Sequence, residues 1–152
     1  MTPHPRIPAF VAILVTGSLG VAALTATGQF RASDAGHMSL PELEKKIVGS
    51  HDGGVWLAYG NALRDLSRFD SAAKAYQRAL DFQPELVDAR LGLGISLGQC
   101  DNKDAFFDYA ARLSASYPKL AVDLLGRPEL HLLHADSRWD PIYTAAKAQA
   151  VD

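Results

Sequence analysis

Residues 56–84 of the chain read WLAYGNALRDLSRFDSAAKAYQRALDFQP. In both halves of this stretch, apolar and small residues recur at helical spacing, with Gly60 in the first half and Ala72 in the second. Two antiparallel helices approach closely where small side chains meet, and larger side chains fill the space around the crossing. Pro84 ends the second helix because proline has no backbone N–H to donate. The stretch therefore predicts a pair of packed helices.

A second, degenerate copy of this pattern runs from about Val87 to Pro118. Its closing proline follows Pro84 at a spacing typical of stacked helix pairs, whose repeat length is about 34 residues. Apolar residues keep their helical spacing through the second copy. We therefore expect two repeats, at about 53–86 and 87–120.

The stretch from Trp56 to Pro84 resembles the tetratricopeptide-repeat (TPR) family, and the second copy does so more weakly, with Arg90 in the place of the large aromatic residue. The residues that carry the resemblance are Trp56, Gly60, Ala72, Tyr76, Ala79, Pro84, Gly94 and Pro118. The resemblance implies an all-α array whose first helices line a groove for a peptide or helix of a partner protein. The groove positions that it implies are Leu57, Asn61, Arg64, Asp65, Asp88, Leu91, Ile95 and Gln99.

The flanks of the repeats also show helical patterns. A polar linker at 31–38 leads into a helical domain at 39–152, which opens with a short helix around Leu43. After the repeats, apolar residues at 120–125 predict one more helix. Asp140 followed by proline predicts the start of a last helix that continues to about residue 148. We expect these C-terminal helices to cap the array.

The N-terminal part of the chain has the length and composition of a membrane-spanning helix. The 20 residues from Ile7 to Ala26 carry no charge, and a helix of that length spans about 30 Å, the thickness of the hydrocarbon layer. We therefore expect residues 1–30 to form a transmembrane anchor. Ser18, Ala22 and Ala26 recur every four residues and would place small side chains on one face, where another membrane helix could approach.

The charges around this segment predict its orientation. Arg6 is the only charged side chain before it, and several charged residues follow it, which places the N-terminus in the cytoplasm and the helical domain in the periplasm, beside a bacterial-type inner membrane. The alternative is a signal peptide cleaved near Ala23 or Gly28. That alternative would release the helical domain into the periplasm or beyond.

Composition argues against several functional classes. The net charge of -2 and the lack of a dense basic stripe argue against nucleic-acid binding. The single cysteine, Cys100, excludes an internal disulfide and is expected to be buried, with cross-linking to a partner as the alternative. Motifs for a serine nucleophile, a nucleotide loop or haem attachment are missing from the sequence. We expect no enzymatic activity, no cofactor and no small-molecule substrate.

Two histidines leave a metal site open as a remote possibility. His131 and His134 lie three residues apart with Asp136 nearby, a spacing that could place zinc ligands on one helix face. The HExxH arrangement is missing, and the histidines flank leucines of the expected capping segment. We therefore expect no metal.

These observations favour a membrane-anchored protein-interaction module that serves as an accessory subunit or assembly factor of an inner-membrane complex. The order of membrane segment, short helix and repeat is also similar to the TPR portion of bacterial c-type cytochrome maturation proteins. That resemblance implies, as an alternative, chaperone-like binding of apocytochrome c. A secreted metal-dependent enzyme is the remote alternative. We expect such a scaffold to bind a protein partner and to associate with the membrane through its N-terminal anchor.

Overall fold

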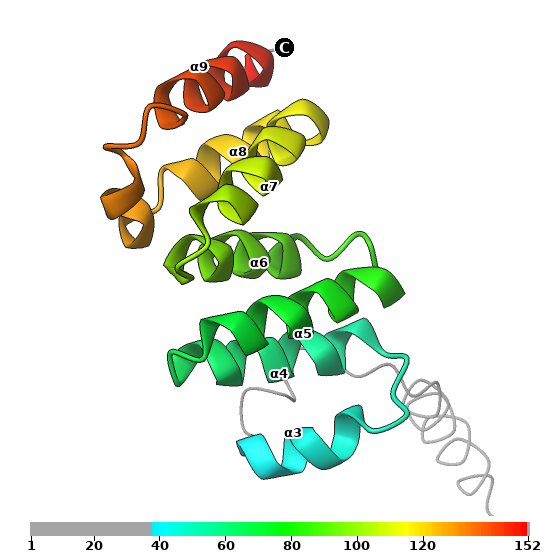
Figure 1. Cartoon of the computed structure of the whole chain (residues 1–152). Helices are drawn as coiled ribbons and strands as arrows, with labels where there is room; N and C mark the ends of the chain where they lie inside the picture. Colours follow the sequence, from blue (N-terminus) through cyan, green and yellow to red (C-terminus); the bar gives the residue numbers. More distant parts are fainter. Residues whose placement is uncertain (1–37, 152) are drawn as a thin grey trace, which may run out of the picture.

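The computed structural model describes residues 38–151, and these residues form helices without any β-strand. Figure 1 shows the helices stacked one upon the next, with α3 at one end of the stack and α9 at the other. The elements are α3 (Leu40–Ile47), α4 (Gly53–Asp65), α5 (Phe69–Phe82), α6 (Val87–Gln99), α7 (Lys103–Ser116), α8 (Pro118–Leu125), the 3₁₀-helix η1 (Pro128–Leu133) and α9 (Trp139–Ala150). The all-α prediction is confirmed for the described residues, whereas the expected membrane segment lies outside them.

Side-chain caps fix where several helices begin. Ser39 and Glu42 form a capping box at α3, in which the Ser39 backbone N–H donates to the Glu42 carboxylate at 2.8 Å. At α4 the Asp52 carboxylate accepts from the Gly54 backbone N–H at 2.8 Å. Asn102 caps α7 in the same manner, through the Ala105 N–H at 3.3 Å.

The turn between α4 and α5 uses a left-handed residue that is not glycine. Ser67 has a φ of 56°, and its N–H donates to the Arg64 carbonyl at 2.8 Å, while the Arg68 N–H donates to the Leu63 carbonyl at 2.9 Å. These bonds close α4 tightly, so that α5 already begins at Phe69. Asp70 lies in the first turn of α5.

The two helix pairs predicted from the sequence are α4 with α5 and α6 with α7. Between them lies the fully buried side chain of Tyr76, on α5. A Cβ added at Gly60 of α4 would stand 2.7 Å from the Tyr76 ring, and one added at Gly92 of α6 would stand 2.5 Å from it. Ala72 is fully buried as well. The small residues therefore make room for one aromatic ring that is shared by the first pair and the start of the second.

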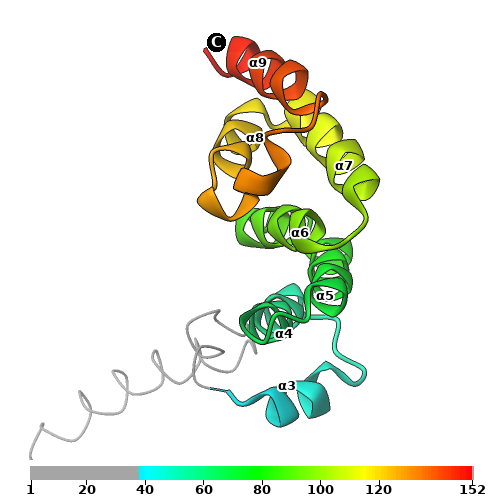
Figure 2. The same cartoon turned by 60° about the vertical axis from the view of Figure 1, so that its left-hand side comes forward.

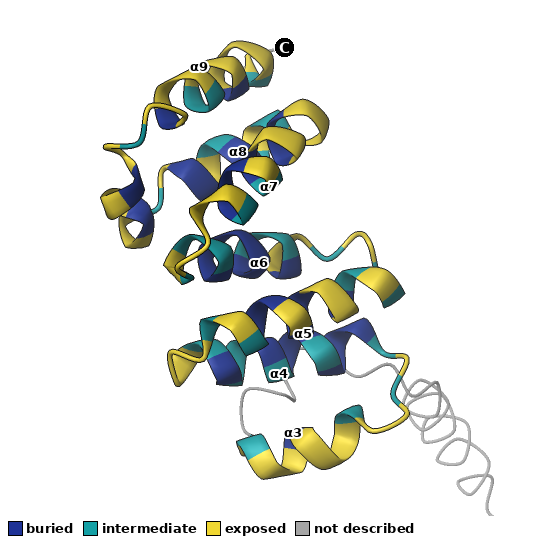
Figure 3. Ribbon diagram, viewed as in Figure 1, coloured by how far each residue is buried: buried dark blue, intermediate teal, exposed yellow. Residues whose placement is uncertain are grey.

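Helix α6 is packed on several sides by its neighbours. It contacts α4, α5, α7, α8 and η1, and its middle, residues 92–96, is buried (Figure 3). Gly94 faces Leu124 of α8, and Gly98 faces Leu130 of η1, so a larger residue at either position would collide with the core. Glycine in a helix costs about 1 kcal/mol relative to alanine, and here that cost is offset by close packing.

A third, irregular helix pair continues the register of the two repeats. Helices α5, α7 and α9 end at Phe82, Ser116 and Ala150, which are evenly spaced along the chain by one repeat length. Helix α8 with η1 takes the place of the first helix of this pair, and α9 packs against both α7 and α8. Figure 2 shows the α8–η1–α9 segment continuing the stack beyond α7. The expected capping helices thus form a further pair in the same register.

Helix α9 starts two residues earlier than predicted. The helix begins at Trp139, so that Asp140 lies in its first turn and is not the N-cap. The indole of Trp139 is 4% exposed and stacks on Phe106 with a ring separation of 6.1 Å. Burial of this large side chain contributes more than a side-chain cap would, which explains why the helix starts there.

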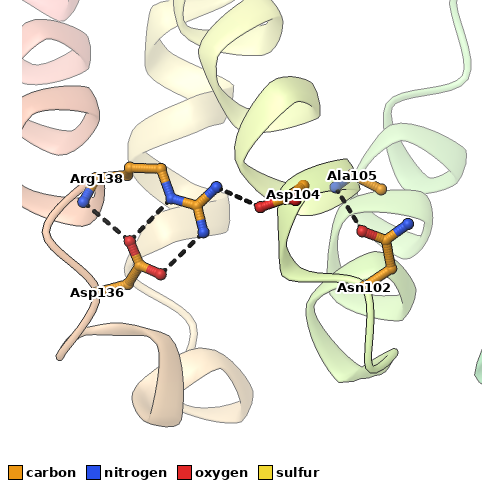
Figure 4. A network of polar contacts seen from close by, with 5 residues as sticks. All are labelled: Asn102, Asp104, Ala105, Asp136 and Arg138. Atoms are coloured by element: carbon orange, nitrogen blue, oxygen red, sulfur yellow. Dashed lines mark hydrogen bonds and ion pairs between the residues drawn. The ribbon is translucent and has the colours of Figure 1, made fainter.

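An arginine joins the loop before α9 to the start of α7 (Figure 4). Arg138 donates to both carboxylate oxygens of Asp136 at 2.9 Å and to Asp104 at 2.7 Å. Its guanidinium also lies 4.2 Å from the centre of the Phe107 ring. The side-chain hydrogen bond from Arg138 lowers the pKa of Asp136 from 3.8 to about 2, with help from the Arg138 backbone N–H.

The lowered pKa of Asp136 makes stability depend on pH in acid. The folded state holds this carboxylate ionised, so its contribution is complete above pH 3.8 and is lost as the pH falls towards 2. We expect the melting temperature to fall over this window, and to fall less in the Asp136→Asn variant. Thermal unfolding followed by circular dichroism measures this fall in melting temperature. The control is Asp108→Asn, which removes a carboxylate from the exposed surface of α7. An equal fall in wild type and Asp136→Asn contradicts the role of the carboxylate.

Candidate functional site

The first helices of the two predicted repeats, α4 and α6, pack against each other. The groove positions implied by the sequence therefore lie on neighbouring helices. Asp65, Asp88 and Gln99 are exposed, and Asn61, Arg64 and Leu91 are partly exposed. We call these six residues the α4–α6 strip. It combines two acidic residues, one arginine, two amides and one leucine.

Two of the expected groove residues are buried in the described structure. Leu57 is 3% exposed and packs in a core cluster with Tyr76, and Ile95 is 7% exposed and packs in a cluster with Phe106. Little of either side chain is left for a partner to contact. The accessible part of the strip is consequently more polar than the sequence indicated.

Asn61 connects the strip to the core beneath it. Its side-chain carbonyl accepts a hydrogen bond from the Tyr76 hydroxyl at 2.7 Å. Burial raises the pKa of Tyr76 to about 12, so the hydroxyl stays protonated and available as a donor at neutral pH. The ring is held between Gly60 and Gly92, which fixes α4 relative to α6. The strip therefore rests on a rigid base.

The ends of the strip are held to different degrees. Arg64 and Asp65 form a surface ion pair of 3.8 Å, with side-chain exposures of 35% and 73%. Exposed pairs of this kind contribute about 0 to 1 kcal/mol, so both groups can turn towards a partner at little cost. By contrast, the Gln99 amide donates to the backbone carbonyl of Glu129 and so ties α6 to η1. The charged α4 end of the strip is thus the freer end.

The residues expected to shape the repeat lie on the helices of the two pairs or directly after them. Trp56 is partly exposed, its indole N–H donates to the Ser50 carbonyl at 3.1 Å, and its ring meets Tyr59 edge to face. Ala79 is fully buried in α5. Pro84 follows the end of α5, and Pro118 is the first residue of α8.

The histidines and the cysteine show no reactive arrangement among the described residues. His131 lies 3.0 Å from the Pro128 carbonyl, and the His134 ring lies 4.2 Å from that of Trp139. Residues 38–151 contain no group of three histidine, cysteine or acidic side chains that could hold a metal ion. Cys100 was expected to be buried and is instead partly exposed. Its partial burial raises the pKa of the thiol to about 11, which keeps the sulfur in the unreactive thiol form.

The membrane prediction falls on residues that the structure does not describe. The small residues of the expected membrane helix, Ser18, Ala22 and Ala26, lie outside the described residues. Most of the expected linker at 31–38 also lies outside them. Among residues 38–151, none of the helices is long and apolar enough to cross a membrane.

The sequence patterns did not predict a hollow that forms where the turn between α5 and α6 meets the turn between α7 and α8. It has a volume of about 790 Å³ and is lined by residues that are distant in the sequence, such as Val87 and Leu120. A sequence pattern on one helix does not reveal such a site, because its walls come from three separate stretches of the chain, at 84–90, at 116–120 and at Gln149. The large apolar side chains of Val87 and Tyr117 are exposed there, a feature that is visible only in the structure.

Comparison with known families identifies the repeat. Residues 60–99 match the family model described as TPR repeat. The match covers the end of α4 and all of α5 and α6. A search of curated proteins gave no match. The resemblance to the TPR family is confirmed for this stretch, and TPR repeats typically bind protein partners.

Proposed function

We propose that the TPR repeat of this chain holds a segment of a partner protein on the α4–α6 strip, without catalytic activity. One observation carries the proposal: charged and amide side chains from two adjacent helices stand in solvent above a base that Tyr76 makes rigid. A preformed surface loses little conformational entropy when a partner binds, which favours affinity. Such a surface suits the binding of a partner protein and not catalysis.

The chemistry of the strip limits the partner. Arg64 is its only basic residue, so it lacks the several cations needed to grip a terminal carboxylate. Asp65 and Asp88 give the strip a net negative charge, and Leu91 offers a single half-buried apolar contact. A helix or extended segment that carries basic side chains beside an apolar one complements this pattern.

The proposed setting is a bacterial-type inner membrane, where the chain acts as an accessory subunit or assembly factor of a membrane complex. This part rests on the uncharged run from Ile7 to Ala26, with residues 1–30 as a single-pass anchor and the helical domain in the periplasm. Intact-mass measurement of the membrane-extracted chain tests it. A mass that lacks the part of the chain up to Ala23 or Gly28 would replace the anchor with a cleaved signal peptide.

Co-purification from solubilised membranes tests the partner-binding role. The full chain is expected to recover a stoichiometric membrane-complex subunit, and the double variant Asp65→Arg/Asp88→Arg is expected to recover about tenfold less. The control variant Glu44→Arg/Asp108→Arg makes the same change in net charge at exposed sites on α3 and α7. Equal recovery by both variants would contradict binding on the strip. Transient recovery of a haem-free cytochrome chain would instead favour the apocytochrome role.

A further inference from the structure

The hollow of about 790 Å³ lies at the edge of the array where one helix pair leads into the next. Its walls come from the turn between α5 and α6, the start of α6, the turn between α7 and α8, and the end of α9. None of the residues that line it belongs to the α4–α6 strip. We call it the junction pocket. Its volume falls in the range of about 300 to 1,000 Å³ that is usual for binding pockets.

The lining of the junction pocket is mainly apolar, and part of it is open to solvent. Val87 is 50% exposed and Tyr117 is 45% exposed, so both present apolar surface to solvent beside the core. Pro84 and Pro118 add apolar rings and have no backbone N–H that would need a partner. An apolar side chain that entered this pocket would remove exposed apolar surface from water.

Two cations stand at the pocket with a single acidic residue, Glu85. Arg90 is held in place: its guanidinium lies 4.1 Å from the centre of the Tyr117 ring and donates to the Tyr117 hydroxyl at 2.9 Å. The backbone carbonyl of Arg90 accepts from the Tyr109 hydroxyl at 2.8 Å. Lys119 is exposed and forms no ion pair with any residue in the described range. The pocket therefore pairs an apolar floor with an excess of positive charge.

We propose that the junction pocket binds a short acidic segment of a partner protein, with one large apolar side chain on the floor and a neighbouring carboxylate facing Arg90 and Lys119. The preference for a carboxylate follows from charge complementarity, because two cations outnumber one acid at the rim. The preset stacking of Arg90 on Tyr117 lowers the entropy cost of that contact. This site is independent of the α4–α6 strip, whose negative charge favours the opposite kind of segment.

Fluorescence anisotropy with the full chain tests the junction pocket. The probes are two labelled hexapeptides, each with one central phenylalanine, flanked by glutamates in one and by lysines in the other. The acidic peptide is expected to bind saturably and the basic peptide about tenfold more weakly. Equal binding of the two peptides, or no saturable binding of the acidic one, would overturn the proposal.

Variants locate the binding on the molecule. Lys119→Glu is expected to weaken binding of the acidic peptide about tenfold and to strengthen binding of the basic peptide. Val87→Ser is expected to weaken binding of both peptides. Lys45→Glu and Val48→Ser make the same changes on α3 and directly after it, at the far end of the stack, and are expected to leave both affinities unchanged. If Lys119→Glu leaves the preference for acidic peptide intact, the site lies elsewhere.

Discussion

Replacing Gly92 with leucine is expected to lower the free energy of unfolding by about 3 kcal/mol, the upper end of the usual cost of overpacking. A Cβ at this position would already stand 2.5 Å from Cζ of Tyr76, closer than real Cβ atoms come. The ring has little room to retreat, because Gly60 holds its other side and Asn61 holds its hydroxyl. The substitution therefore pushes α5 and α6 apart.

Urea denaturation of the full chain, followed by helical circular dichroism, measures this effect. Ala111→Leu is the matched control, since it adds the same kind of side chain at an exposed position of α7 and is expected to change stability by less than about 0.5 kcal/mol. Gly92→Ala sharpens the test. Alanine normally stabilises a helix relative to glycine by about 1 kcal/mol, and here it is expected to destabilise. Unchanged midpoints in both Gly92 variants would show that the ring does not pack there.

Removing the ring itself is expected to have the largest effect. Tyr76→Ala should cost about 4 kcal/mol, because it deletes a fully buried aromatic side chain and leaves a cavity between two helix pairs. Tyr76→Phe keeps the ring and loses only the hydrogen bond to Asn61, at a cost of about 1 kcal/mol. The difference between the two variants separates packing from hydrogen bonding.

A double-mutant cycle then tests whether the two predictions share one cause. In a Tyr76→Leu background the smaller side chain leaves room at Gly92, so Gly92→Ala is expected to become neutral or stabilising. If Gly92→Ala destabilises the Tyr76→Leu protein as much as the wild type, the two residues are not in contact.

Much of the repeat could be predicted from the sequence because its signals are local. Gly60, Ala72 and Pro84 mark a close crossing and a stop, and Pro118 repeats the stop one repeat length later. These features place α4 to α7 correctly. The turn at Ser67 was not foreseen, since a left-handed φ is expected at glycine or asparagine and not at serine.

The rest of the array could not be predicted in this manner because it depends on contacts between distant residues. Nothing near Gly92 or Gly98 shows that Tyr76 and Leu130 will lie against them. The third helix pair is irregular because η1 interrupts its first half, and it is recognised as a pair only because α9 ends in register with α7. For the same reason, burial of Leu57 was hidden until its neighbours were known.

The partner-binding role of the α4–α6 strip is tested most directly by photocross-linking. A benzoylphenylalanine placed singly at Asp65 and at Asp88 of the full chain, in membranes of the native cell, reports which protein lies on the strip. We expect a cross-link to the same partner from both positions and none from the control position Asp108 on α7. Cross-links from Asp108 alone, or none from Asp65 and Asp88 while the partner still co-purifies, would contradict it.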